Sequence, residues 1–208
     1  MNNEALKNIF LFLEKKEGKA IPKKYIDLLS GSELIKLLET HTSGVQLVTN
    51  DIYLERSNIT KLPADLYVDG FLILANCTQL EKLPDKLYVD GYLDLKNCIQ
   101  LTKLPDELYV GVDLDLTNCT KLTELPDNLH VGDNLNLRNC TKLTELPDNL
   151  HVGEELMLER LNITEIPTNL YVKYLSITDS LLAKKYTDDE IYEIIESTGG
   201  EITGRIYR

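Results

Sequence analysis

A segment of 21 residues recurs along this chain, and the repeat constrains the fold more than any other feature. Its clearest mark is a cysteine every 21 residues, at Cys77, Cys98, Cys119 and Cys140. Leu-Pro pairs keep the same step and begin at residues 62, 83, 104, 125 and 146. One copy of such a unit cannot bury its apolar side chains alone, whereas stacked copies build a continuous core. The spacing therefore predicts a solenoid in which each copy forms one turn, here called a rung.

Each rung contains a Leu-x-Leu motif that predicts a short strand with one buried face. In Leu93-Asp94-Leu95, the period of two turns both leucines to one side and Asp94 to the other. Pro84 and Gly91 punctuate the same rung and favour backbone turns. Inward apolar pairs occur seven times, at residues 52/54, 72/74, 93/95, 114/116, 135/137, 156/158 and 175/177. We therefore expect seven strands, stacked in one sheet.

The repeat L-P-D-x-L-x-V-x-G-x-L-x-L-x-N-C-x-x-L-x-x-L resembles the short LP-type leucine-rich repeats of bacteria and phages, which are about 21 residues long. The similarity covers roughly residues 45–178. It implies an α/β fold, a curved right-handed leucine-rich-repeat solenoid with a parallel sheet on its concave side and extended or 3₁₀ turns outside. Secreted bacterial ubiquitin ligases use similar repeats beside a large catalytic domain, and we expect no room for one in 208 residues.

The segments that flank the repeats predict caps over the open ends of a solenoid at residues 44–178. Residues 1–43 are expected to form a helical N-terminal cap, because apolar residues recur there at helical spacing. These residues are Leu6, Ile9, Phe10 and Leu13. Residues 179–208 are expected to form a helix-plus-strand C-terminal cap, with Thr187 and Glu190 as a capping box at the start of the helix.

The periodic cysteines favour a structural role over disulfide, redox or metal chemistry. Each lies three residues after the second strand leucine, where a buried side chain can bond the backbone of a neighbouring rung. There is no CxxC pair. The preceding asparagines are expected to form a parallel column. The N-terminal residues do not suit a secretory signal or a membrane span, so we expect a cytoplasmic protein, in its own cell or delivered to a host cytoplasm.

Charge is concentrated on the repeats and limits the class of partner. The formal net charge is −12, and residues 44–178 contain 11 basic and 21 acidic residues. Direct nucleic-acid binding requires basic residues that neutralise phosphates, so this balance argues against nucleic acid and against anionic membranes as ligands. Part of the acid is expected to cap the turns after each Leu-Pro pair.

Enzymatic residues are difficult to find in this sequence. An open sheet does not provide the positioned acid/base pair in a dry cleft that such catalysis needs, and no phosphate loop or nucleophile elbow occurs. His130 and His151 replace tyrosines in one column, so their rings should lie close together, but two ligands are too few for a zinc site. We expect no enzyme activity, no cofactor and no metal.

Outward positions of the Leu-x-Leu strands vary between rungs and form the candidate binding site. Tyr53, Phe71, Ile73 and Tyr92 should form an aromatic patch over the first three rungs. The adjoining candidate contact residues are polar. They are Asp94, Asp113, Asp115, Asn134 and Asn136.

The predicted function is a monomeric, non-enzymatic protein-binding module, such as an inhibitor, effector or adaptor, with one protein partner on its concave face. The alternative is an acidic nucleic-acid mimic that occupies the DNA- or RNA-binding surface of a basic protein. A hydrolase or transferase ranks third. Aromatic substitutions should abolish binding in the first case, and salt should abolish it in the second.

Overall fold

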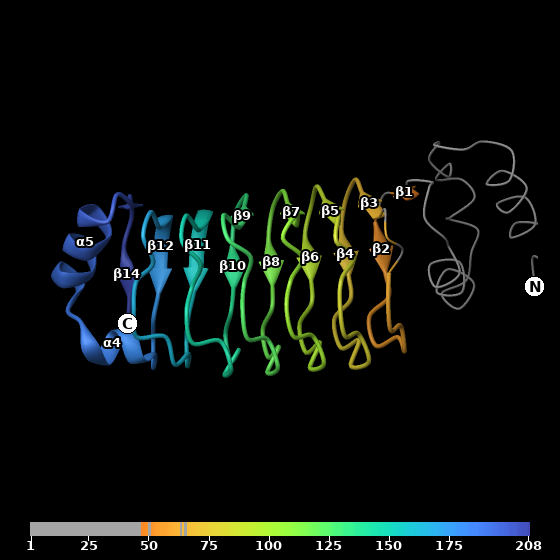
Figure 1. Ribbon diagram of the computed structural model, residues 1–208, viewed down its shortest axis with the longest axis horizontal. Helices are drawn as coiled ribbons and strands as arrows, with labels where there is room; N and C mark the ends of the chain where they lie inside the picture. The colour runs from red at the N-terminus through yellow and green to blue at the C-terminus, as the bar shows by residue number, and fades with distance from the viewer. Residues whose placement is uncertain (1–46, 50, 63, 65) are drawn as a thin grey trace, which may run out of the picture.

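The computed structural model describes residues 47–208 except 50, 63 and 65, and it shows a parallel β-solenoid of about six turns. The rungs follow one another along the long axis of the molecule from β2 to β14 (Figure 1). The predicted helical cap at residues 1–43 lies outside the described residues.

The rungs up to β10 each contribute two short strands, because the chain bends between a first segment, Tyr-Val in the middle rungs, and the Leu-x-Leu segment. The first column of strands contains β1 (Leu47–Thr49), β3 (Leu66–Val68), β5 (Tyr88–Val89), β7 (Tyr109–Val110) and β9 (His130–Val131). The second column contains β2 (Ile52–Tyr53), β4 (Leu72–Ile73), β6 (Leu93–Asp94), β8 (Leu114–Asp115) and β10 (Leu135–Asn136). β11 (His151–Met157) and β12 (Tyr171–Ser176) run through both columns and join them.

The predicted seven-strand sheet therefore differs from the described one, which has 14 strands. The first residue of each inward pair lies in one of the strands β2, β4, β6, β8, β10, β11 and β12, which pair with one another in this order. The prediction missed the first column. It expected a terminal strand in residues 201–208 as part of the cap, and β14 (Ile206–Tyr207) lies there and extends the second column beyond β12. The alternation of apolar and outward residues in Leu87-Tyr88-Val89 could have predicted a strand of the first column, since Leu87 and Val89 are buried and Tyr88 points outward.

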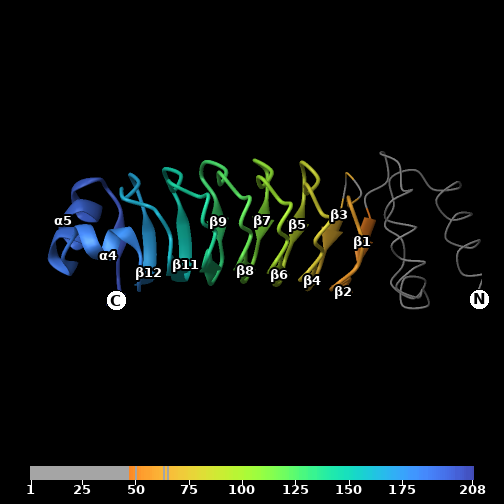
Figure 2. The same ribbon diagram turned by 90° about the horizontal axis from the view of Figure 1, so that it is seen from below.

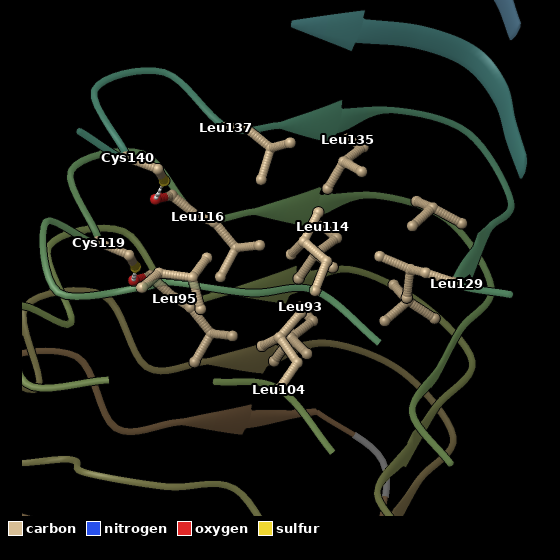
Figure 3. Close-up of a cluster of buried hydrophobic side chains, with 14 of the residues drawn as sticks. Leu93, Leu95, Leu104, Leu114, Leu116, Cys119, Leu129, Leu135, Leu137 and Cys140 are labelled. Carbon is tan, nitrogen blue, oxygen red and sulfur yellow. Dashed lines mark hydrogen bonds between the residues drawn. The ribbon is translucent and has the colours of Figure 1, made fainter. Parts of the chain in front are cut away.

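The core is a stack of leucines that repeats from rung to rung. Leu93 and Leu95, and their equivalents Leu114 and Leu116, have no exposed surface. Figure 3 shows these side chains of successive rungs turned into the interior, with Cys119 beside them. Burying a leucine is worth about 1.5–3 kcal/mol, so stacking of the leucines provides the main stabilisation.

The cysteines line one corner of this core as free, buried thiols, as predicted. Each Sγ donates a hydrogen bond to a leucine carbonyl of the preceding rung. The pairs are Cys77 with Leu54 at 3.1 Å, Cys98 with Leu74 at 3.3 Å, Cys119 with Leu95 at 3.2 Å and Cys140 with Leu116 at 3.1 Å. Burial raises the pKa of Cys98 and of Cys140 to about 12, so neither thiol ionises at neutral pH.

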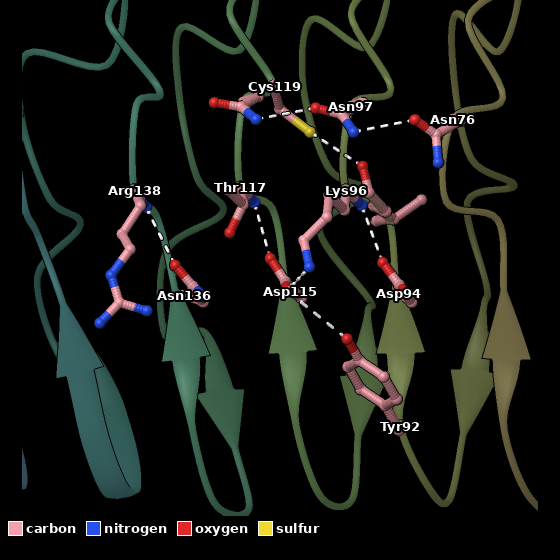
Figure 4. A network of polar contacts seen from close by, with 12 residues as sticks. Asn76, Tyr92, Asp94, Lys96, Asn97, Asp115, Thr117, Cys119, Asn136 and Arg138 are labelled. Carbon is pink, nitrogen blue, oxygen red and sulfur yellow. Dashed lines mark hydrogen bonds and ion pairs between the residues drawn. The ribbon is translucent and has the colours of Figure 1, made fainter.

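The asparagines before the cysteines form a second hydrogen-bonded column. The Nδ2 group of Asn97 donates to Oδ1 of Asn76 at 2.9 Å (Figure 4). Asn118 donates to Asn97 in the same way at 2.8 Å. Asn139 donates to Asn118 at 2.9 Å. All four have positive φ, between 59° and 63°, a left-handed conformation that asparagine tolerates better than other side chains except glycine.

A close backbone approach explains the glycine at the bend of the middle rungs. A Cβ placed on Gly132 would overlap the carbonyl oxygen of Gly111 in the preceding rung. Two neighbouring rungs could then not approach to sheet spacing at this point.

The C-terminal residues form two helices and two strands beyond β12, and one of the helices was not predicted. The helix α5 (Asp188–Ser197) begins with the expected capping box, in which Thr187 and Glu190 each accept a backbone hydrogen bond from the other. The unpredicted helix is α4 (Leu181–Lys185), which is capped by Ser180. Strands β13 (Glu201–Ile202) and β14 pair with β12, and both helices lie at this end of the molecule (Figure 2).

Candidate functional site

The open face of the sheet, defined as the side of the Leu-x-Leu strands turned away from the core, carries all nine predicted site residues. Strand register aligns one column of them directly. Tyr53 pairs with Ile73, Ile73 with Asp94, Asp94 with Asp115, and Asp115 with Asn136. Phe71, Tyr92, Asp113 and Asn134 alternate with the buried leucines and precede this column in their rungs.

The aromatic patch comprises Tyr53, Phe71, Ile73 and Tyr92 on the first three rungs. Tyr53 is 62% exposed and Phe71 is 44% exposed, while Ile73 and Tyr92 are half-buried. Asp51 supports the edge of the patch, since its carboxylate accepts a hydrogen bond from the Phe71 backbone N–H at 2.9 Å. The patch therefore presents large apolar side chains on an ordered backbone.

The acidic cluster comprises Asp94, Asp113 and Asp115 and adjoins the patch. Asp115 is the most enclosed member, at 8% exposed. It accepts hydrogen bonds from the Thr117 N–H at 2.8 Å and from the Tyr92 hydroxyl at 3.5 Å, and it pairs with Lys96 at 3.4 Å (Figure 4).

The other two carboxylates also accept backbone hydrogen bonds. Oδ1 of Asp94 accepts from the Lys96 N–H at 3.0 Å (Figure 4). Oδ1 of Asp113 accepts from the backbone N–H of Asn134 at 2.9 Å and from its side-chain amide at 2.7 Å. Among the described residues, neither Asp94 nor Asp113 has a cationic partner within ion-pair distance.

Asn134 and Asn136 repeat these bonds one rung later with a neutral side chain. Oδ1 of Asn136 accepts from the Arg138 N–H at 3.2 Å, and Oδ1 of Asn134 accepts from the Glu155 N–H at 3.1 Å. The sequence predicted these residues as contacts for a partner and missed their bonds to the backbone. Such a bond occupies one oxygen and leaves the rest of each side chain on the open face.

Tyr92, a member of the aromatic patch, interacts electrostatically with the carboxylates of the acidic cluster. Burial, together with the charges of Asp94, Asp115 and Asp113, raises the pKa of Tyr92 above its ordinary value. Burial, followed by the charge of Asp115, also raises the pKa of Asp94. The negative charges of the cluster are thus close enough to disfavour the ionised forms of Tyr92 and Asp94.

A column of stacked rings on the first strands lies beside this face, at the positions where the sequence aligns tyrosines with the two histidines. Tyr67, Tyr88 and Tyr109 stack with ring centroids 4.2 and 4.3 Å apart. The rings of His130 and His151 stack at 4.6 Å, as the repeat spacing predicted. Burial, and then the neighbouring imidazole, lowers the pKa of His151.

A metal-binding cluster, or a pocket near the predicted site residues, would be a second kind of candidate site in the described part of the chain. No three His, Cys, Asp or Glu side chains gather there in a way that could hold a metal ion. A hollow of about 490 Å³ is lined by the Leu-Pro corners of three rungs, including Asp106, Glu124 and Asp127, and contains none of the predicted site residues. Neither α4 nor α5, nor any other described helix, could cross a membrane.

Comparisons with protein-family models, with curated proteins and with solved structures gave no match for this chain. The geometry of the open face is therefore the basis for the functional conclusion.

Proposed function

We propose that this protein is a non-enzymatic protein-binding module of the leucine-rich-repeat type that holds one protein partner on its open face. The aromatic patch carries the proposal. At the positions of Phe71, Ile73 and Tyr92, later rungs of the same sheet have polar residues such as Asp113 and Asn136. The fold accepts polar side chains there, so packing does not explain the apolar ones.

The patch has the composition of a binding hot spot. Contiguous exposed apolar side chains are uncommon on soluble proteins and mark interaction sites, and aromatic residues dominate the binding energy of protein interfaces. Seven stacked strands at a spacing of about 4.8 Å extend over roughly 30 Å, enough for an interface of standard size.

The finer features of the proposal follow from the repeat. They are a curved seven-rung sheet with this face concave, a helical N-terminal cap, and a monomeric protein that acts in a cytoplasm as an inhibitor, effector or adaptor. Four free, buried thiols are consistent with a reducing compartment.

Partner capture from a lysate of the native host tests the proposal. The double variant Phe71→Ala plus Tyr92→Ala should keep a melting temperature within a few degrees of the wild type, because Phe71 is exposed and Tyr92 half-buried. Truncation of aromatic hot spots typically costs 2 kcal/mol or more, so capture should weaken by at least about tenfold.

The matched control is Ile99→Ala, which removes another exposed apolar side chain (39%) in a turn outside the open face. It should leave capture unchanged. Undiminished capture by the folded double variant would move the binding site elsewhere, and unfolding of the variant would place these residues in the core.

The acidic nucleic-acid mimic is the second candidate, because 21 acidic and 11 basic residues lie on the solenoid. In that case added nucleic acid and salt should displace the partner, while the aromatic substitutions should leave capture intact.

A further inference from the structure

The carboxylates of the acidic cluster supply more charge than their structural bonds require. Asp94 and Asp115 each accept the backbone N–H two residues further along, and Asn136 makes the same bond with a neutral amide oxygen. Asp113 accepts the N–H of the next rung, as Asn134 does. The fold therefore needs a side-chain oxygen that accepts a backbone hydrogen bond at these positions, and the neutral amide of asparagine provides one.

The extra charge opposes folding at this place. Asp94 and Asp115 are register partners on adjacent strands, and like charges directly across a sheet are destabilising. Burial and the Asp115 charge raise the pKa of Asp94, which is the direction expected for a carboxylate that is unfavourable when ionised. The backbone hydrogen bonds do not require this charge, because Asn136 and Asn134 make the same bonds with neutral oxygens, and among the described residues only Asp115 gains an ion pair from it.

In the described part of the chain, only one member of the cluster has an ion-pair partner. Lys96 pairs with Asp115 at 3.4 Å, and Arg138 pairs with Glu159 at 2.6 Å. Within the described residues this leaves Asp94 and Asp113 without an ion-pair partner beside Tyr92 and the aromatic patch, and the charge of Lys96 acts on Asp94 only from beyond ion-pair distance.

We propose that Asp94 and Asp113, together with the aromatic patch, form a docking surface for a basic segment of a protein that places Lys or Arg side chains over the carboxylates and an apolar side chain over Phe71 and Ile73. This inference rests on the proposed protein-binding function and specifies its partner. Charge complementarity selects a cationic partner, and the apolar half of the surface selects a polypeptide over a metal ion or a small cation.

The experiment uses the full chain and a short synthetic peptide in which lysines and arginines flank a central phenylalanine and leucine. A twin peptide carries glutamate in place of each lysine and arginine. The variant Asp94→Asn plus Asp113→Asn removes charge and keeps the oxygens that accept the backbone bonds. The matched control, Asp85→Asn plus Asp106→Asn, removes two exposed carboxylates at the Leu-Pro corners, away from the open face.

Fluorescence anisotropy of the labelled peptides should show binding of the basic peptide to the wild type and none of the acidic twin. The Asp94/Asp113 variant should bind the basic peptide at least about tenfold more weakly, and an increase from about 50 to about 300 mM salt should weaken wild-type binding. The corner variant should bind within about twofold of the wild type. The melting temperature of the Asp94/Asp113 variant should equal or exceed that of the wild type.

Three results would overturn the inference: no binding of the basic peptide to the wild type, equal binding by the Asp94/Asp113 variant, or a lowered melting temperature of that variant. Partner capture separates this failure from failure of the proposed function. If Phe71→Ala plus Tyr92→Ala abolishes capture and Asp94→Asn plus Asp113→Asn does not, protein binding stands and cation recognition is wrong.

Discussion

Substitution of Asn118 should measure how much the asparagine column stabilises the solenoid. Its side chain makes two hydrogen bonds, donating to Asn97 at 2.8 Å and accepting from Asn139 at 2.9 Å. Its φ is 63°, in the left-handed region. Replacement by alanine removes both bonds and leaves a Cβ in that region without a compensating amide.

The expected loss of free energy of unfolding has two contributions, the hydrogen bonds and the backbone strain. Each hydrogen bond is worth about 1 kcal/mol net, so the two together contribute about 2 kcal/mol. A left-handed alanine adds about 1 kcal/mol of strain, which gives about 3 kcal/mol for Asn118→Ala. Glycine adopts positive φ freely, so Asn118→Gly should cost about 2 kcal/mol.

Urea unfolding monitored by circular dichroism provides the measurement, since a lower midpoint at unchanged slope reports lost stability. Thr120→Ala in the same turn is the control, because Thr120 is exposed, and it should change the free energy of unfolding by less than about 0.5 kcal/mol. If glycine and alanine cost the same, backbone strain plays no part. If both match the control, the asparagine column does not stabilise the fold.

Three further results are expected. Leu114→Ala should lower the free energy of unfolding by about 2–5 kcal/mol in the same urea assay, because Leu114 is fully buried; a loss near zero would contradict the strand register. The folded pKa of His151 lies below its unfolded value of 6.5, so stability should be complete above this pH and decline as pH falls through it. His151→Tyr, which restores the tyrosine of other rungs, should remove that dependence, and melting curves that fall equally for both proteins would contradict it. A small thiol reagent should label Cys98 and Cys140 slowly in the native state and rapidly in urea, and fast native labelling would show that these thiols are not buried.

Much of the architecture could be predicted from the sequence because a rung's interactions repeat at a fixed step. The alternation of Leu93, Asp94 and Leu95 predicts which side chains are buried, and the 21-residue spacing predicts that equivalent leucines stack. Position within the rung likewise predicted the buried thiols. The capping box at Thr187 needed only local sequence, since its partners are three residues apart.

The first column of strands was missed because its members, such as Tyr88–Val89, are only two or three residues long and stand next to a turn. Propensity over so short a segment carries little information, and pairing with the adjacent rungs makes it a strand. The helix α4 is similarly short, and it is stabilised by its Ser180 cap and by the burial of Leu182 in the core.

By itself the sequence determined the period, the buried set and the outward direction of Phe71 and Tyr92. Only the tertiary structure decided what those outward groups contact: that Asp94 and Asp115 bond the backbone, that Asn136 replaces them without charge, and that Tyr92 reaches Asp115 in the next rung. Inward positions are set by alternation within one strand, whereas outward contacts depend on the register and separation of strands about 21 residues apart.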